Sequence, residues 1–198
     1  MLKRFEDRYT HLDLTGGPPL PAVHAEPRIA LELETTRLLL REMTPLDGPA
    51  MLAVWGDAET MHWYPRALTR EEVALWIERQ MERYRSGTGL LAMALKETGE
   101  VIGDCGPVWH EPDGPPEIEI GYHVRRDCWN RGYATEAARA VRDYAFTRLG
   151  CDHVISLIRP ENVQSRRVAE KNGFTVDRMV FWRDYNHCVY RLNRETAR

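Results

Sequence analysis

The stretch that decides the fold lies where a strand pattern gives way to a helix pattern across one short loop. It reads Val124-Arg125-Arg126-Asp127-Cys128-Trp129-Asn130-Arg131-Gly132-Tyr133-Ala134-Thr135-Glu136. Backbone N–H groups at a helix start have no intrahelical partner, and together with the helix dipole they suit a phosphate or pyrophosphate. Gly132 permits a close backbone approach, and Ala134 leaves the next turn uncrowded. The junction therefore predicts an anion-binding site at the head of a helix.

The local charge favours the same interpretation. Residues 123–142 contain five arginines against Asp127 and Glu136, although the whole chain carries a net charge of -3. Only three of the 27 basic residues are lysine, but most arginines are spread along the chain, as a codon bias would leave them. An ordinary strand-loop-helix junction with solvated arginines is the alternative, because a single glycine is weak evidence. The loop lacks the glycine patterns of a P-loop and of a dinucleotide fingerprint.

Hydrophobic periodicity on both sides of the loop predicts an α+β fold. Strands are expected at roughly 31–43 with a break at Thr35-Thr36, then at 90–96, 100–109, 116–125, 153–158, 174–184 and 187–193. Helices are expected from Thr44-Pro45 to Trp55, from the Thr69 cap to Gly87, at 132–149, and from the Asn162 cap to about 171. This order predicts a central mixed, mostly antiparallel sheet of six to seven strands, with about four helices in three layers.

Length and composition set further limits. At 198 residues we expect one domain at 31–198, with residues 1–30 as an N-terminal extension that could be a packing arm. The first residues lack the apolar segment of a signal peptide, and no stretch approaches the ~20 apolar residues of a membrane span. The four cysteines and seven histidines form no metal-binding pattern. We therefore expect a cytoplasmic protein with reduced thiols and no metal.

A second motif follows the loop. Asn162 and Ser165 stand three apart at a helix start, before Asn172-Gly173-Phe174, and capping alone would explain the pair. Together with Trp129-Asn130-Arg131-Gly132-Tyr133-Ala134, however, it resembles the GNAT superfamily of acyl-CoA-dependent N-acetyltransferases, whose pyrophosphate loop usually reads Gln/Arg-x-x-Gly-x-Gly/Ala. Two further stretches resemble the branch that acetylates ribosomal-protein N-termini: Thr36-Arg37-Leu38-Leu39-Leu40-Arg41 and Glu119-Ile120-Gly121-Tyr122. The resemblance covers roughly 33–193.

The resemblance implies acetyl-CoA as the cosubstrate. The residues that it implies for binding are His123, Val124, Trp129, Asn130, Arg131, Gly132, Tyr133, Ala134, Thr135, Asn162 and Ser165. Trp129 replaces the usual Gln or Arg, and Asn130 replaces a frequent glycine, so the backbone there should adopt a φ that Asn tolerates. The tyrosine that many relatives use as a general acid is absent, because Ala169 takes its place.

Acetyl transfer to an amine requires that an ammonium lose its proton and that a thiolate leave. Glu119 is the predicted base, with Glu117 on the same strand face as second choice and as a substrate contact. Both could instead be surface carboxylates paired with arginine. Ser165 could donate to the thiolate, and Asn162 could bond the pantetheine amide or simply cap its helix. Trp63 and Tyr64 are predicted to contact the acceptor, although packing as core is an alternative.

The sequence therefore predicts an N-acetyltransferase that moves an acetyl group from acetyl-CoA to a primary amine. The amine is a protein N-terminus or a small molecule, and attack is direct within a ternary complex, because nothing resembles a covalent nucleophile. A non-catalytic acyl-CoA sensor or interaction module is the alternative. Nucleic acid is disfavoured as a partner, because the basic residues form no single stripe. We expect a monomer or homodimer without a membrane partner.

Overall fold

Eight strands form one sheet in the part of the chain that the computed structural model describes, residues 30–197. They are β1 (Glu32–Glu34), β2 (Leu38–Arg41), β3 (Leu91–Leu95), β4 (Val101–His110), β5 (Glu117–Val124), β6 (His153–Ile158), β7 (Thr175–Trp182) and β8 (Tyr185–Asn193). Their spatial order is β1-β2-β3-β4-β5-β6-β8-β7. Only β5 and β6 run parallel within this sheet. The predicted α+β class is confirmed, whereas the extension predicted at 1–30 lies outside the described residues except for residue 30.

The sheet has one strand more than the upper limit of the prediction. The break at Thr35-Thr36 is a turn, in which the Thr35 N–H donates to the Leu38 carbonyl at 2.9 Å. Strands β1 and β2 therefore pair with each other as an antiparallel hairpin. The apolar run at 31–43 gives two neighbouring strands for this reason.

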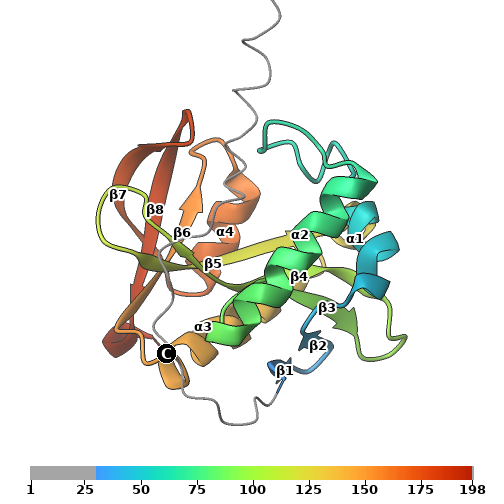
Figure 1. The fold of residues 1–198 in the computed structure, drawn as a ribbon. Coiled ribbons are helices and arrows are strands. Elements are labelled where there is room, and N and C mark those ends of the chain that lie inside the picture. The colour runs from blue at the N-terminus through green and yellow to red at the C-terminus, as the bar shows by residue number, and fades with distance from the viewer. Residues whose placement is uncertain (1–29, 198) are drawn as a thin grey trace, which may run out of the picture.

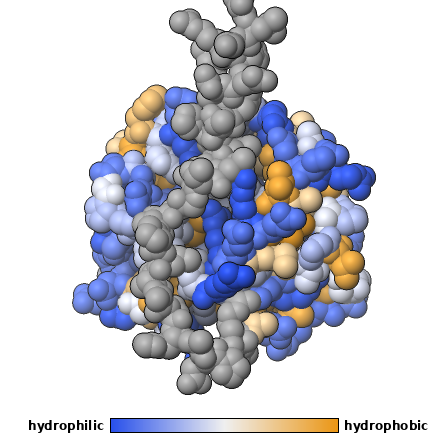
Figure 2. Space-filling model, viewed as in Figure 1, coloured by the Kyte–Doolittle hydropathy of each residue, from blue (hydrophilic) through white to orange (hydrophobic). Residues whose placement is uncertain are grey.

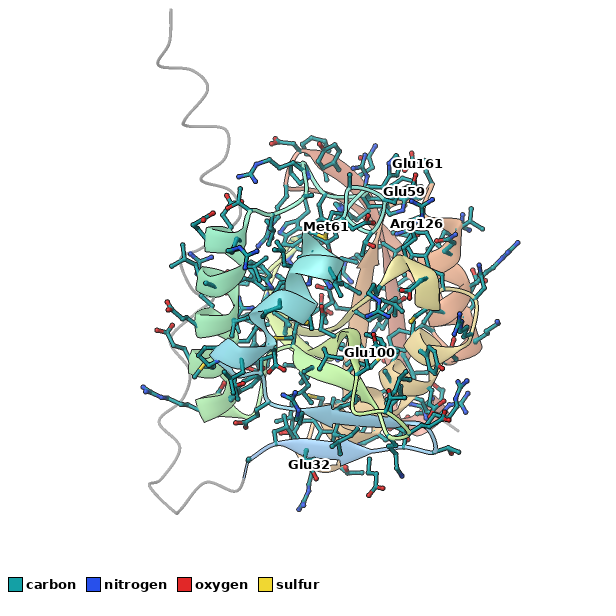
Figure 3. The ribbon with its side chains drawn as sticks, turned by 90° about the vertical axis from the view of Figure 1, so that its right-hand side faces the viewer. Glu32, Glu59, Met61, Glu100, Arg126 and Glu161 are labelled. Carbon is teal, nitrogen blue, oxygen red and sulfur yellow. The ribbon has the colours of Figure 1, made fainter. Side chains whose placement is uncertain are left out.

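Four α-helices in the described residues cover the two faces of the sheet: α1 (Gly48–Trp55), α2 (Arg70–Arg83), α3 (Tyr133–Thr147) and α4 (Val163–Lys171). Figure 3 shows α2 on one side of the strands, with α3 and α4 on the other. Helix α1 lies on the α2 side, where its Trp55 indole donates to Asp104 of β4 at 2.8 Å. The three-layer arrangement is thus confirmed.

The predicted caps fix where two helices begin. The Thr69 side chain accepts from the Glu72 N–H while the Glu72 side chain accepts from the Thr69 N–H, which is a capping box at the start of α2. The Asn162 side chain accepts from the Ser165 N–H at 3.1 Å and caps α4. Because these bonds are local, they could be predicted from residue spacing alone.

The core lies on both faces of the central strands. Its largest fully buried side chains include Trp55, Tyr84 and Tyr190, and Trp55 meets Trp76 edge-on with ring centroids 6.0 Å apart. Trp76 and Trp109 are partly buried and pack against this core. Figure 2 shows a mainly hydrophilic outer surface with scattered apolar residues on the face that carries α2. No helix among the described residues is long and apolar enough to cross a membrane.

Candidate functional site

The sheet opens between β5 and β6. These parallel strands pair at Glu119 and Ile155. The next two hydrogen bonds between them involve side chains instead of two backbone groups. The Ser156 hydroxyl donates to the Ile120 carbonyl at 3.0 Å, and the Leu157 N–H donates to the Glu119 carboxylate at 3.1 Å. Figure 1 shows the two strands diverging beyond this point. A cleft of about 1140 Å³ lies along the opening.

Most of the residues predicted for the site line this cleft. Those that do are Trp63, Tyr64, Glu119, His123, Val124, Trp129, Asn130, Gly132, Tyr133, Ala134, Thr135, Asn162 and Ser165. Glu117 and Arg131 lie outside it. The structure therefore brings predicted residues from three separate segments into one cleft.

The loop before α3 has the backbone geometry expected of an anion-binding turn. Asn130 has a φ of 59° and Gly132 a φ of 83°, so both lie in the left-handed region. Gly132 is the N-cap of α3 and supplies no side chain to satisfy the first N–H groups of that helix. The Trp129 indole donates to the Val124 carbonyl at 2.6 Å and anchors the loop to the end of β5. The α3 amides are thus left for another acceptor.

The hairpin of β1 and β2 holds this loop from outside. The Arg37 guanidinium donates to the Glu136 carboxylate at 2.7 Å and to the Arg131 carbonyl at 2.9 Å, and it lies 4.5 Å from the centre of the Tyr133 ring. The Thr35 hydroxyl donates to the same carboxylate at 2.7 Å. Sequence reasoning missed this clamp, because its partners stand about a hundred residues apart.

The arginines near the loop are less available to an anion than their clustering indicated. Arg125 donates to Asp127 at 2.6 Å and to Glu100 at 2.7 Å, so two carboxylates already pair with it. Arg126 Nε lies 3.8 Å from Oε2 of Glu59, and both side chains are exposed (Figure 3). The backbone amides and the helix dipole, rather than Arg125, make the stronger anion site.

One wall of the cleft comes from the start of α4. Ser165 and Asn162 line it, and the Tyr122 hydroxyl donates to the Ser165 carbonyl at 3.0 Å. This bond ties α4 to β5, whose even-numbered side chains point toward that helix. Ala169 is buried and carries no proton donor. Tyr122 was not singled out from the sequence, because its partner is a backbone carbonyl on a distant helix.

Glu119 faces the cleft from the opposite side of the sheet. Its carboxylate pairs with Nε2 of His110 at 2.9 Å, and both side chains are 16% exposed. Burial alone would raise the pKa of Glu119, but His110, the Leu157 N–H and Arg183 outweigh it, so this pKa lies below its usual value. Glu119 is therefore a stable anion, suited to holding a cation.

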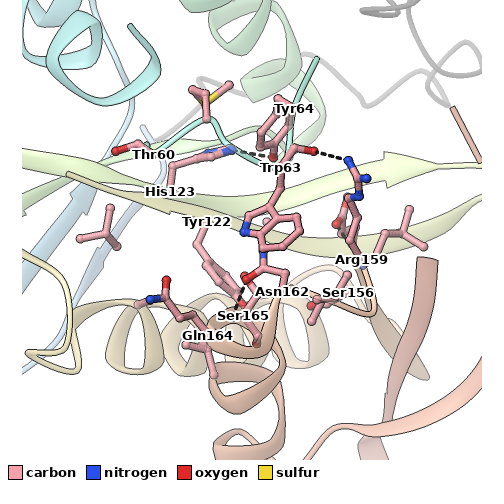
Figure 4. Close-up of a pocket in the computed structure, with 18 of the residues that line it drawn as sticks. Thr60, Trp63, Tyr64, Tyr122, His123, Ser156, Arg159, Asn162, Gln164 and Ser165 are labelled. Atoms are coloured by element: carbon pink, nitrogen blue, oxygen red, sulfur yellow. Dashed lines mark hydrogen bonds between the residues drawn. The ribbon is translucent and has the colours of Figure 1, made fainter. Parts of the chain in front are cut away.

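A second histidine–carboxylate pair lies four residues further along β5. His123 stands opposite Asp104 in the β4–β5 register, and its Nδ1 lies 2.9 Å from Asp104 Oδ1. Its Nε2 lies 2.6 Å from the Tyr64 hydroxyl (Figure 4). Burial alone would lower the pKa of His123, but Asp104 and Glu119 outweigh it and raise that pKa. The imidazole faces the α1 side rather than the α3 loop.

Glu117, the second-choice base, belongs to a structural network. Its carboxylate pairs with Arg178 at 2.7 Å, with His153 at 3.0 Å and with Arg191 at 3.5 Å. The side chain is 8% exposed and is absent from the cleft lining. Glu117 therefore lies outside the cleft, where β6, β7 and β8 surround its carboxylate with His153, Arg178 and Arg191.

Aromatic side chains cover the end of the cleft near Glu119. Trp63 and Tyr64 line it, as do Trp182 and Tyr185 of the β7–β8 hairpin. Arg159 lies 3.7 Å from the centre of the Tyr185 ring and donates to the Trp63 carbonyl at 3.3 Å. Tyr64 is 42% exposed and therefore is not core. Figure 4 shows Tyr64 and His123 above Asn162, Gln164 and Ser165.

Within residues 30–197, no group of three or more His, Cys, Asp or Glu side chains could hold a metal ion.

Comparison with known proteins agrees with this geometry. Residues 37–175 match the family model described as an acetyltransferase (GNAT) domain. The uncharacterized protein YkkB of Bacillus subtilis is 33% identical over 151 residues, which is 75% of this chain and 88% of YkkB. The acetyltransferase from Agrobacterium tumefaciens str. C58 has a similar crystal structure, with a TM-score of 0.71 and 31% identity over 88% of this chain and all of that one.

A likeness to a coenzyme A complex extends the comparison. RimL, a ribosomal L7/L12 alpha-N-protein acetyltransferase solved with coenzyme A, superposes with a TM-score of 0.67 over 82% of this chain and 98% of that one. At 17% identity this likeness concerns the fold alone. GNAT enzymes use acetyl-CoA, so the predicted cosubstrate and the predicted family are both confirmed. The chain belongs to the GNAT acetyltransferase family.

Proposed function

We propose that this enzyme transfers the acetyl group of acetyl-CoA to a primary amine by direct attack in a ternary complex. The observation that carries the proposal is the cleft itself, which joins an uncapped helix N-terminus on one side to a stable carboxylate on the other. An anion and an ammonium can therefore be held in one enclosed space. Such positioning supplies a large part of the rate in acyl transfer.

The α3 loop is proposed to hold the pyrophosphate of coenzyme A. Asn130 and Gly132 set its left-handed turn, and Arg131 to Thr135 present successive amides beyond it. His123 and Val124, at the open end of β5, are proposed to lie beside the pantetheine arm through their backbone groups. Trp129 contributes by anchoring the loop to Val124, and Asn162 reaches the cleft from the cap of α4.

Glu119 is proposed to receive the acceptor as an ammonium and to take the proton that it must lose before attack. Its lowered pKa keeps it charged at neutral pH, and Trp63 and Tyr64 supply an aromatic wall beside it. Aromatic faces attract ammonium groups as well as apolar carbon. Ser165, on the opposite wall, is proposed to donate its hydroxyl proton toward the departing thiolate.

The test is release of free coenzyme A thiol from acetyl-CoA over a panel of primary amines. The panel should include peptides with free N-termini, polyamines, amino acids and amino sugars, with mass spectrometry to identify the acetylated product. Each active amine has a matched control in its N-acetylated form, which should give no turnover. Tight acetyl-CoA binding by calorimetry without turnover for any amine would contradict the proposal and favour a sensor.

A further inference from the structure

We propose that Asp104, His123 and Tyr64 form a proton relay that accepts the proton released by the attacking nitrogen. This inference rests on the proposed acetyl transfer, but it concerns a different proton from the one assigned to Glu119. An amine that attacks a carbonyl becomes positively charged and must lose a further proton before the product amide is stable. The three residues lie in one hydrogen-bonded line from the core to the cleft.

The strand register creates the buried half of the relay. Asp104 and His123 are directly opposite each other in the antiparallel pair β4–β5, so both side chains project from the same face. Glu119 shares that face four residues earlier, which makes it the face turned toward the acceptor side of the cleft. His123 is 10% exposed and Asp104 is fully buried.

Two donors converge on the Asp104 carboxylate and fix the state of the imidazole. The Trp55 indole N–H donates to Oδ2 at 2.8 Å, and Nδ1 of His123 donates to Oδ1 at 2.9 Å. A carboxylate has only acceptor positions, so the His123 proton sits on Nδ1. Nε2 of the neutral ring then carries no proton, and it faces the Tyr64 hydroxyl.

Tyr64 connects this base to the cleft. Its hydroxyl oxygen lies 2.6 Å from Nε2 of His123, so the hydroxyl donates to this nitrogen when the ring is neutral, and the ring centres lie 5.2 Å apart. The phenol oxygen keeps a lone pair for an N–H donor on its other side. Tyr64 lines the cleft and is 42% exposed as a whole residue, and the relay requires the bound amine to lie beside that oxygen.

The proton step balances without an additional reactant. The neutral amine nitrogen attacks the thioester carbon and forms the C–N bond, while the carbonyl π pair moves to oxygen. The nitrogen then gives a proton to the phenol oxygen as the phenol proton passes to Nε2 of His123. The oxyanion pair then re-forms the C=O bond as the C–S bond breaks with its electron pair on sulfur, and the proton on His123 passes to water.

Other groups around His123 are compatible with this role. The charged and titratable groups that act on the relay are Asp104 from β4, Glu119 and Tyr122 from β5, Tyr64 from the loop before α2, and Arg183 from the β7–β8 turn. Glu119 is less suited to the same step, because His110 and the Leu157 N–H already hold its two oxygens. The relay offers an acceptor nitrogen backed by a fully buried carboxylate, Asp104.

The test compares His123→Asn with a matched control, His153→Asn. Asparagine places an N–H near the position of Nδ1, which keeps the bond to Asp104 but removes the basic Nε2. We expect kcat to fall about 100-fold for His123→Asn and several-fold less for Tyr64→Phe. The KM for acetyl-CoA should stay within about twofold in both variants, whereas H153N should keep wild-type kcat. Wild-type kcat in H123N, under conditions where the wild type turns over, would overturn the inference.

A second measurement needs no acceptor. Nitrogen NMR of the histidine rings should show His123 as the Nδ1–H tautomer with an unprotonated Nε2, and its titration should shift in Tyr64→Phe but not in H153N. An imidazole that stays doubly protonated from pH 6 to 9 could not accept a proton and would overturn the relay. Absence of turnover in the wild type, by contrast, would contradict the acetyl-transfer proposal, so the two failures are distinguishable.

Discussion

Two histidine–carboxylate pairs stand on the same two strands, yet their charges are arranged in opposite ways. In the Asp104–His123 pair the carboxylate is fully buried and the histidine is directed toward the cleft. In the Glu119–His110 pair both side chains are equally exposed, and the carboxylate also accepts a backbone N–H. From this difference we infer that burial of the acid, rather than the presence of a pair, decides which group exchanges a proton.

The largest expected effect comes from reversing the direction of the hydrogen bond between Asp104 and His123. In Asp104→Asn the amide oxygen can still accept from Trp55, but the amide N–H₂ donates to Nδ1 of His123 and moves the ring proton to Nε2. A ring protonated there cannot accept from Tyr64. We expect kcat to fall about 10²–10⁴-fold, measured by thiol release, with a cooperative thermal transition retained.

A wild-type kcat in D104N would remove the distinction between the two pairs. The nitrogen NMR spectrum gives an independent check, because the tautomer of His123 should change even if turnover is limited by another step.

The second pair should respond more weakly. In Glu119→Gln the charge that holds the ammonium is lost, so we expect kcat/KM for the amine to fall about 10- to 100-fold. Affinity for acetyl-CoA, measured by calorimetry, should be nearly unchanged. The matched control is Glu117→Gln, two residues away on the same strand face but outside the cleft. Equal losses in the two variants would mean that neither effect is local.

A change on the other side of the cleft should separate binding from proton transfer. Gly132 has a φ of 83°, which a β-branched side chain adopts only with strain. In Gly132→Val we expect the Kd for acetyl-CoA to rise about tenfold or more, while the pH dependence of kcat stays that of the wild type. Unchanged affinity would move the pyrophosphate away from the α3 loop.

The smallest expected effect is on the acidic side of the pH profile of kcat, which identifies the histidine–carboxylate pair that exchanges the proton. A relay base must be unprotonated, and the pKa of His123 is raised above its usual 6.5, so kcat should fall as the pH drops through a value above 6.5. The pKa of Glu119 is lowered below its usual 4.5, and a limb due to this group would lie below 4.5. The fall in kcat at a pH above 6.5 should disappear in H123N. The amine is the same in the assays of the wild type and of H123N, so its own ionisation cannot cause this difference.

Local interactions account for what the sequence predicted well. The Thr69 and Asn162 caps depend on residues a few positions apart, and spacing alone identifies them. The left-handed Asn130 and the α3 loop are equally local, but the resemblance to a family was needed to single them out. The extra strand was missed because a break in an apolar run can be a bend or a hairpin turn. Only pairing between β1 and β2 decides between the two.

Long-range contacts account for what could not be predicted. Alternation placed Glu117 and Glu119 on one face, but it could not show that β6, β7 and β8 bring His153, Arg178 and Arg191 to only one of them. The one signal in the sequence for the Asp104–His123 pair was that Asp104 is a single acidic residue in a mostly apolar strand. Its partner could not be predicted, because the β4–β5 register sets His123 opposite it.

The Arg37 clamp links the order of synthesis to the cofactor loop. Arg37 and Glu136 are 99 residues apart, so the β1–β2 hairpin leaves the ribosome long before the loop that it holds. Closing so long a segment costs chain entropy, which the three contacts of Arg37 must offset. We therefore expect a tag or truncation that disturbs residues 30–41 to release the loop at 129–135 and weaken acetyl-CoA binding, although the sequence of the loop is unchanged.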